Sequence, residues 1–335
     1  MLMGEQLVFS YIKKDDMITV IENKHTNTFK YEYYFQYSDM KTRIHAIQWI
    51  PEGEIKGVVQ IVHGVAEYAK RYEDFALFLN SHGFAVVSHD HKGHGLSVSN
   101  NIRLYIGDSG SWWNVVKDVY KLQQISRNDF PDVSYFMFGH SMGSFIVRCY
   151  LIKNLSNIDG CILSGTGSPG KLEVIAGRCI IKIISRFKGS NAYSKLVDNL
   201  IFGKFNHYFK NENYEAAWVS KSKNNIKKYL EDPLCGGKVT LGLFSELLYG
   251  SLFSTKSENI NKMDKIIPIL LISGEDDPVG NMSKGVKKTY AKYKKSGIQD
   301  VKMILYPNLR HEILNEEGND KIYCDILEWL NSKIK

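Results

Sequence analysis

The chain is poor in cysteine, and its cysteines form no pair at metal-binding spacing. Only five occur among 335 residues, and no Cys-x-x-Cys motif is present. An odd, scattered set argues against a disulfide framework and against a zinc site built on thiolates. We therefore expect buried thiols in a reducing compartment.

Long apolar runs are missing as well. No stretch of 18 apolar residues occurs, so the sequence predicts no membrane-spanning helix. The first 16 residues also lack a basic start leading into an apolar run, which argues against a signal peptide. These absences predict a cytoplasmic protein.

Strong compositional bias is absent, but the charge is unevenly placed. With 44% hydrophobic and 24% charged residues, the chain is neither disordered nor collagen-like. The net charge is +7; residues 166–262 hold 15 Lys and Arg against 8 Asp and Glu, and the remainder is balanced. A basic excess confined to one segment makes that segment a candidate contact surface for anionic lipid, and we expect no nucleic-acid partner.

Short apolar runs alternate with helix-period stretches before residue 165 and after residue 265. Uninterrupted runs of this length are typical of parallel strands buried on both faces. Ahead of them, the aromatic-rich residues 31–37 and 43–49 predict an antiparallel hairpin at a sheet edge. The alternation predicts an α/β fold with a mostly parallel sheet and helices on both faces. The runs are residues 58–62, 84–87, 135–138, 161–163, 269–272 and 303–305.

Residues 166–262 interrupt this rhythm, because they show helix-period apolar residues and no clear strand. We interpret them as a helical cap inserted between two strands. The predicted organisation is therefore an N-terminal extension over residues 1–29, a first core part over 30–165, the cap over 166–262 and a second core part over 263–335.

The run 135–138 leads into Gly139-His140-Ser141-Met142-Gly143, and an amphipathic stretch follows. Gly-x-Ser-x-Gly between a strand and a helix is typical of a nucleophilic serine held in a strained turn. There the hydroxyl lies at a helix N-terminus, where developing negative charge is favoured. The alternative is a serine that only shapes the turn.

A serine nucleophile needs a base and an acid that orients the base. In this type of sheet the chain order is serine, acid, histidine. His311 follows the run 303–305 and is the only histidine after His207. Three adjacent acids, residues 275–277, follow the run 269–272; we choose Asp277, which directly precedes a proline.

The oxyanion of a tetrahedral intermediate needs two donors. One candidate is the backbone N–H of Met142, after the serine, and the other is that of Val65, in the loop after the run 58–62. Gly64 permits a close backbone approach in that loop, and we place Gly64 and His140 among the substrate-binding residues.

Two further patterns carry no cofactor or metal in our interpretation. Residues 165–170 fit Gly-x-Gly-x-x-Gly, but residues 174–197 contain no acid for a ribose, so we expect a glycine-rich entry to the cap. His91 and His94 lie three apart without a third ligand at a known spacing, so we expect a turn scaffold.

Four segments together resemble the monoacylglycerol lipase and lysophospholipase-like branch of the α/β-hydrolases, which is also grouped with serine aminopeptidases. They are His63–Tyr72, Asp90–Ser97, Gly139–Ser144 and the tail that contains Gly274, Asp277 and His311. The likeness covers roughly residues 30–335.

By this resemblance, Ser141, Asp277 and His311 match the family triad, Val65 and Met142 match the oxyanion donors, and the insertion matches the cap that shapes the acyl channel. The chain departs from the family at Tyr68, where the family usually has His, and at Lys92, where Arg is common. Neither position belongs to the triad, but Tyr68 bears on polar substrate contacts.

We therefore expect a serine esterase that cleaves a monoacylglycerol or lysophospholipid through an acyl-enzyme at Ser141, with no metal or organic cofactor. One rival is a serine aminopeptidase, which needs a cap acid for the substrate ammonium group. Candidates are Glu212, Glu215 and Asp232, although the positive cap opposes a cationic substrate. Another rival is a ligand-binding scaffold, which usually lacks a triad residue.

Residues 172–188 predict an amphipathic helix in the cap. Arg178, Lys182 and Arg186 recur on one side, while the other carries mostly apolar residues (Ile180, Ile181, Ile183, Ile184 and Phe187) together with Glu173. One interpretation is peripheral contact with an anionic membrane. The other is a helix whose apolar face packs on the core and whose basic face is solvated.

Overall fold

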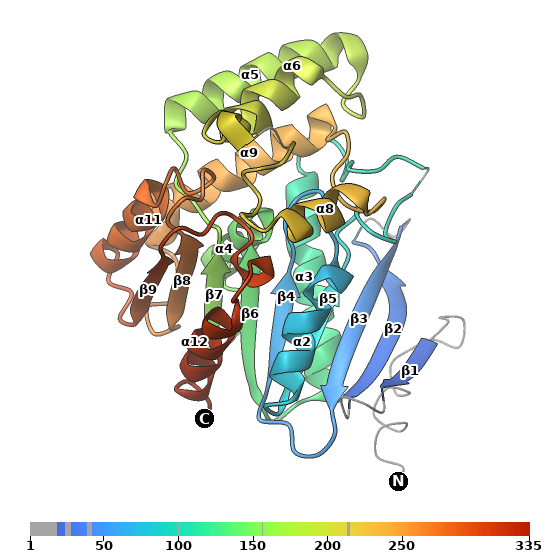
Figure 1. Ribbon diagram of the computed structural model, residues 1–335, viewed down its shortest axis with the longest axis vertical. Coiled ribbons are helices and arrows are strands. Elements are labelled where there is room, and N and C mark those ends of the chain that lie inside the picture. Colours follow the sequence, from blue (N-terminus) through green and yellow to red (C-terminus); the bar gives the residue numbers. More distant parts are fainter. Residues whose placement is uncertain (1–18, 24–27, 39–41, 100, 156, 213–214) are drawn as a thin grey trace.

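A mostly parallel sheet forms the centre of the molecule (Figure 1). The computed structural model describes residues 19–23, 28–38, 42–99, 101–155, 157–212 and 215–335. In these residues the sheet has nine strands in the order β1-β2-β3-β5-β4-β6-β7-β8-β9. The strands are β1 (Thr19–Asn23), β2 (Thr28–Gln36), β3 (Arg43–Pro51), β4 (Gly57–Val62), β5 (Phe84–His89), β6 (Ser134–His140), β7 (Gly160–Ser164), β8 (Ile269–Gly274) and β9 (Val301–Tyr306).

The predicted fold class is confirmed. All six apolar runs lie in strands β4 to β9, which pair in parallel in the sheet order β5-β4-β6-β7-β8-β9. The predicted hairpin is the antiparallel pair β2–β3, with Tyr33 opposite Ala46. One expectation was wrong: β9 is not buried on both faces, and residues 303–305 are only half-buried because β9 is the edge strand.

Helices cover both faces of the sheet and divide the core in two. Figure 1 shows α2 and α12 in front of the strands, with α3 and α4 behind them. One core cluster joins the sheet to η1 (Ala69–Tyr72), α2 (Glu73–Asn80) and α12 (Asp320–Asn331). The other joins it to α3 (Ser111–Asp129), α4 (Met142–Ile152) and α11 (Lys284–Lys295).

Only helices and loops follow β7 before β8 begins, in the part of that stretch that the structure describes. Figure 1 shows α5 and α6 above the sheet, farthest from it, whereas α9 packs against α3 and α4 of the core. The helices are α5 (Lys171–Lys188), α6 (Lys195–Asp198), the π-helix η2 (Asn199–Gly203), α7 (Lys204–His207), η3 (Lys210–Glu212), α8 (Lys223–Glu231), α9 (Leu241–Thr255) and α10 (Ser257–Ile260).

The N-terminal part of the sheet was not predicted. Strand β1 pairs antiparallel with β2 and lies in the segment interpreted as an extension, residues 1–29. The residues used to argue against a signal peptide lie outside the described ones. Among the described residues, none of the helices has the length and hydropathy that crossing a bilayer requires.

Candidate active site

Ser141 stands at a sharp turn between β6 and α4, at the carboxyl end of the sheet. Its backbone has a positive φ of +52° with ψ −118°, a conformation that is strained for a residue with a Cβ. The two glycines of the motif are required by space: a Cβ on Gly139 would lie 2.7 Å from the Gly143 carbonyl, and one on Gly143 would overlap the Val62 carbonyl. The predicted strand–turn–helix context is confirmed.

His311 and Asp277 meet beyond the ends of β9 and β8. The Nδ1 atom of His311 lies 3.0 Å from Oδ2 of Asp277, and both side chains are buried. The second oxygen of Asp277, Oδ1, accepts the Val279 N–H at 2.9 Å. Of the three adjacent acids, it is therefore Asp277 whose carboxylate holds the imidazole.

The pKa of His311 is raised above its ordinary value of 6.5. Burial by itself lowers the pKa, because it disfavours the imidazolium, but the charge and hydrogen bond of Asp277 outweigh it. The charges of Glu312 and Glu67 act in the same direction as Asp277. The site thus stabilises a positive charge on His311.

Ser141 and His311 each lie beside the end of β7. The Ser141 N–H donates to the Ser164 carbonyl at 3.0 Å, and a Cβ on the next residue, Gly165, would lie 2.8 Å from Cε1 of His311. The sequence pattern predicts Gly165 only as part of a glycine-rich entry to the cap. Its lack of a side chain leaves room for His311 and for His140, which would lie 3.1 Å from the same Cβ.

His140, predicted to bind substrate, is buried beside His311, with ring centroids 4.6 Å apart. Burial, and secondly the charge of His311, hold the pKa of His140 well below its usual range, so this imidazole is neutral. Its Nδ1 lies 3.3 Å from the Ser164 hydroxyl. His140 therefore packs against the candidate base.

The loop after β4 comes close to Ser141, as predicted. A Cβ on Gly64 would lie 3.1 Å from Cβ of Ser141. The Gly64 N–H is already donated to Oε1 of Glu67 at 2.5 Å. By contrast, within the described part of the chain the N–H groups of Val65 and Met142 donate to no protein acceptor, which leaves them available for an oxyanion.

The histidine-rich turn after β5 packs against the first residue of this loop, His63. His91 and His94 pack on His63, with ring centroids 4.0 and 5.3 Å away. The His91 N–H donates to Nε2 of His63 at 3.0 Å, and His63 Nδ1 lies 2.7 Å from the Gly64 carbonyl. Among the described residues, no three His, Cys, Asp or Glu side chains are grouped to hold a metal.

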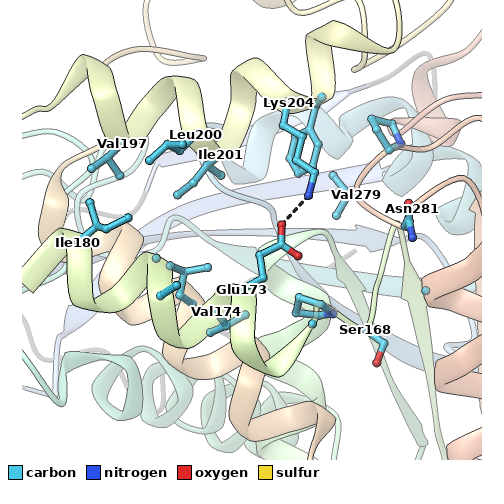
Figure 2. A pocket seen from close by; sticks show the side chains of 18 of the residues that line it. Ser168, Glu173, Val174, Ile180, Val197, Leu200, Ile201, Lys204, Val279 and Asn281 are labelled. Carbon is cyan, nitrogen blue, oxygen red and sulfur yellow. Dashed lines mark hydrogen bonds and ion pairs between the residues drawn. The ribbon is translucent and has the colours of Figure 1, made fainter.

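An apolar pocket of about 540 Å³ lies between the cap helices and the loop that follows β8 (Figure 2). Ser141, Asp277 and His311 are not among the residues described as its wall. Its wall includes Val279, two residues after Asp277, together with Val174 and Ile181 of α5. Figure 2 shows Glu173 and Lys204 facing each other across the pocket, joined by an ion pair of 2.5 Å. Phe205, another wall residue, contacts Trp218 with its ring tilted by 51°.

Trp218 is a site residue that sequence analysis missed. Its ring centroid lies 5.1 Å from that of His311 and 5.2 Å from that of Phe205, so it connects the pocket wall to the candidate base. It sits in the cap, 93 residues before His311. No local motif marks it, and the only signal was its aromatic character within a basic insertion.

Comparison with known proteins agrees with this architecture. Residues 53–318 match the family Hydrolase_4, described as serine aminopeptidase, S33. Among curated proteins, the chain is 26% identical over 291 residues to a monoacylglycerol lipase of Mycolicibacterium smegmatis, covering 85% of this chain and 92% of that protein. It is 25% identical to the monoglyceride lipase of Homo sapiens, over 85% and 86% of the two chains.

Solved structures are similar as well. A thermostable carboxyl esterase from Bacillus coagulans, crystallised with glycerol, superimposes with a TM-score of 0.85 at 27% identity, over 91% of this chain and 98% of that chain. A monoglyceride lipase from Saccharomyces cerevisiae, at 19% identity and a TM-score of 0.71, shares the fold over 90% and 95% of the chains. The chain therefore belongs to the Hydrolase_4 family of serine aminopeptidase S33 type, and it is a hydrolase with the α/β-hydrolase fold.

Proposed function

We propose that this protein is a serine hydrolase that cleaves lipid esters, with a monoacylglycerol or a lysophospholipid as its substrate. The observation that carries the proposal is the hydrogen-bonded Asp277–His311 pair, together with an apolar pocket whose wall includes Pro278 and Val279, directly after Asp277. A pocket with mostly apolar walls takes an acyl chain, and a buried carboxylate–imidazole pair activates a serine. The lipid names of the curated relatives support the same substrate class.

In this mechanism Ser141 Oγ attacks the acyl carbonyl while Nε2 of His311 takes its proton. The oxyanion accepts hydrogen bonds from the N–H groups of Val65 and Met142. His311 then protonates the leaving alcohol, which yields an acyl-enzyme at Ser141. Water attacks the acyl-enzyme with His311 again as base, and the fatty acid leaves. Asp277 holds the Nδ1–H of His311 throughout and stabilises the imidazolium.

Amide hydrolysis is the rival that the family description keeps open. Two of the three cap acids that could hold a substrate ammonium group are engaged elsewhere. Glu212 forms an ion pair with Arg310, and Asp232 accepts the Tyr68 hydroxyl at 2.8 Å. These contacts favour an ester over an aminoacyl substrate.

Labelling with a fluorophosphonate probe tests the enzyme class. We expect the protein to be labelled at Ser141, and Ser141→Ala to lose both labelling and ester hydrolysis while remaining folded. A panel of a monoacylglycerol, a lysophosphatidylcholine and an aminoacyl amide then tests the substrate class. Preferential cleavage of the aminoacyl amide, or full activity in Ser141→Ala, contradicts the proposal.

The exposed side of α5 supports a further part of the proposal, peripheral contact of a cytoplasmic enzyme with an anionic membrane. The predicted helix is confirmed, but its apolar side does not pack on the core as a whole: Ile181 is buried, whereas Ile183 and Phe187 are 61% and 83% exposed. Leu172 is 82% exposed as well. Exposed apolar residues flanked by Lys182 and Arg186 are suited to an anionic lipid surface.

Cys179 offers a direct test, because it is exposed on the same helix. A polarity-sensitive dye on Cys179, in a Cys324→Ser background that removes the other exposed thiol, reports insertion. We expect a blue shift with phosphatidylserine vesicles at low salt, and its loss in Phe187→Ser. The matched control is Ile266→Ser, another exposed apolar residue outside the cap helices. Equal response to neutral and anionic vesicles contradicts the electrostatic part.

A further inference from the structure

One guanidinium, that of Arg71, bridges two buried carboxylates at the candidate active site. Its Nη1 donates to Oε2 of Glu67 at 2.9 Å and to Oε1 of Glu312 at 2.7 Å, and its Nη2 donates to Oε2 of Glu312 at 2.7 Å. The three side chains are only 10%, 4% and 7% exposed. The contact with Glu312 is bidentate, and it joins residues 241 positions apart.

Each carboxylate is tied to a different half of the site. Glu67 accepts the Gly64 N–H at 2.5 Å and the Tyr72 hydroxyl at 2.9 Å, so it fixes the backbone directly before Val65. Glu312 directly follows His311. Its N–H donates to the Val219 carbonyl at 2.8 Å.

Side-chain amides complete the surroundings of Glu312. Its Oε2 accepts the amides of Asn225 and Asn315 at 3.1 and 3.0 Å. Asn225 lies on α8 of the cap, and Asn315 lies at the end of η4 (Ile313–Asn315). A lysine at position 71 has no planar fork, so it cannot make the two parallel bonds to Glu312 together with the bond to Glu67.

The charges at this bridge are unequal, because two carboxylates share one cation. Burial raises the pKa of Glu312, but Arg71 overrides it and lowers that pKa to about 2, so Glu312 is ionised. Burial raises the pKa of Glu67 against the opposing effect of Arg71. The charged or titratable groups around His311 are Asp277, Glu312, Glu67, Arg71 and His140.

We propose that Arg71 and Glu312 are positioning residues for the reaction: their ion pair fixes the loop of His311 relative to the loop of the oxyanion donors. This inference rests on the proposed function. Neither residue touches the reacting atoms. Because catalysis depends on sub-ångström placement of base and oxyanion donors, loosening the bridge lowers kcat more than it changes KM.

The test uses the full-length protein and four variants: Arg71→Lys, Arg71→Met, Glu312→Gln and the double variant Arg71→Met/Glu312→Gln. A control is the pair of Lys30 and Glu73, which are 2.7 Å apart with side chains 9% and 33% exposed. The controls are Lys30→Met and Glu73→Gln. We measure kcat and KM for a short water-soluble ester from about pH 5 to 9, with Tm for every variant.

We expect each bridge variant to lose about 10- to 100-fold in kcat with a small change in KM. Glu312→Gln removes a negative charge near His311, so the acid limb of the pH profile moves to lower pH. Arg71→Met removes the positive charge and moves that limb to higher pH. The double variant restores the charge balance, so its limb returns toward that of the parent while kcat stays low. Arg71→Lys keeps the positive charge, so the acid limb stays in place while kcat falls.

Opposite shifts of the acid limb show that the bridge acts on the charge of His311, and a kcat that stays low in the double variant is the result that a charge effect alone does not give. Bridge variants within about twofold of the parent in kcat, or losses equalled by the Lys30 and Glu73 controls, overturn the inference. If Arg71→Met does not fold, the nearly isosteric Glu312→Gln decides by the same criteria. The proposed function fails separately, through an unlabelled parent or an active Ser141→Ala.

Discussion

Replacing Asp277 by asparagine separates the candidate triad from the neighbouring acids. The Asp277 oxygen that accepts the Val279 N–H at 2.9 Å must remain an acceptor. The NH2 group of the introduced amide is then forced toward His311, whose Nδ1 lies 3.0 Å from the other oxygen. His311 must accept at Nδ1 and carry its proton on Nε2, where it cannot take the proton of Ser141.

The expected loss is about 10⁴-fold in kcat, because the fold is kept and only the tautomer is wrong. This corresponds to roughly 5 kcal/mol of transition-state stabilisation. Hydrolysis of a short p-nitrophenyl ester measures it, with Asp276→Asn as the matched control. Among the described residues, Asp276 makes one hydrogen bond, from its backbone N–H to the Leu309 carbonyl at 2.9 Å. Comparable losses in both variants, or a larger one at Asp276, refute this reasoning.

Four further predictions concern activity and stability at low pH, the acyl pocket and metals. Because the pKa of His311 is raised above 6.5, kcat/KM falls as pH drops through a value above 6.5, measured with a short ester at low substrate concentration. Stability also falls on acidification, because five buried histidines have lowered pKa values in the folded protein, about 4 for His94. The unfolded chain therefore binds protons first below pH 6.5, and Tm decreases there despite the opposite contribution of His311. The five are His63, His89, His91, His94 and His140. Val174→Phe fills the pocket wall, so kcat/KM for long-chain esters falls about tenfold while short esters are unaffected; an equal loss for both contradicts the pocket assignment. EDTA leaves the rate unchanged, and inhibition that added metal reverses contradicts a metal-free mechanism.

The sequence predicted the fold well because its strongest signals are physical requirements of that fold. Parallel strands between two helix layers must be apolar on both faces, and the runs in β4 to β8 are fully buried. The Ser141 turn was predictable for a similar reason, since the packing of α4 on β4 and β6 leaves no room for a Cβ at two fixed positions. Strand β1 was missed, because five residues at a sheet edge carry too weak a pattern.

The neighbours of the candidate triad were harder to predict than the triad itself. Order along the chain pointed to His311, but nothing local indicates that Trp218 packs against it or that Arg71 pairs with Glu312. These contacts join residues 93 and 241 positions apart, and they exist only after the cap and both loops have folded together. Sequence reasoning identifies residues that chemistry requires, whereas supporting residues are selected by tertiary geometry.

The burial of the cap helix α5 could not be predicted from its sequence either. Its sequence pattern was interpreted as two faces, one apolar and one basic, and the apolar face was assigned to either the core or a membrane. The structure divides the helix into three faces instead. Val174 and Ile181 form a narrow buried line, Ile183 and Phe187 are exposed, and Lys182 and Arg186 flank the exposed residues. A periodic pattern states how residues are distributed around a helix, but only the packing of neighbouring elements decides which part of the circumference is buried. A helix that serves both a pocket and a surface therefore needs its structure before its function can be argued.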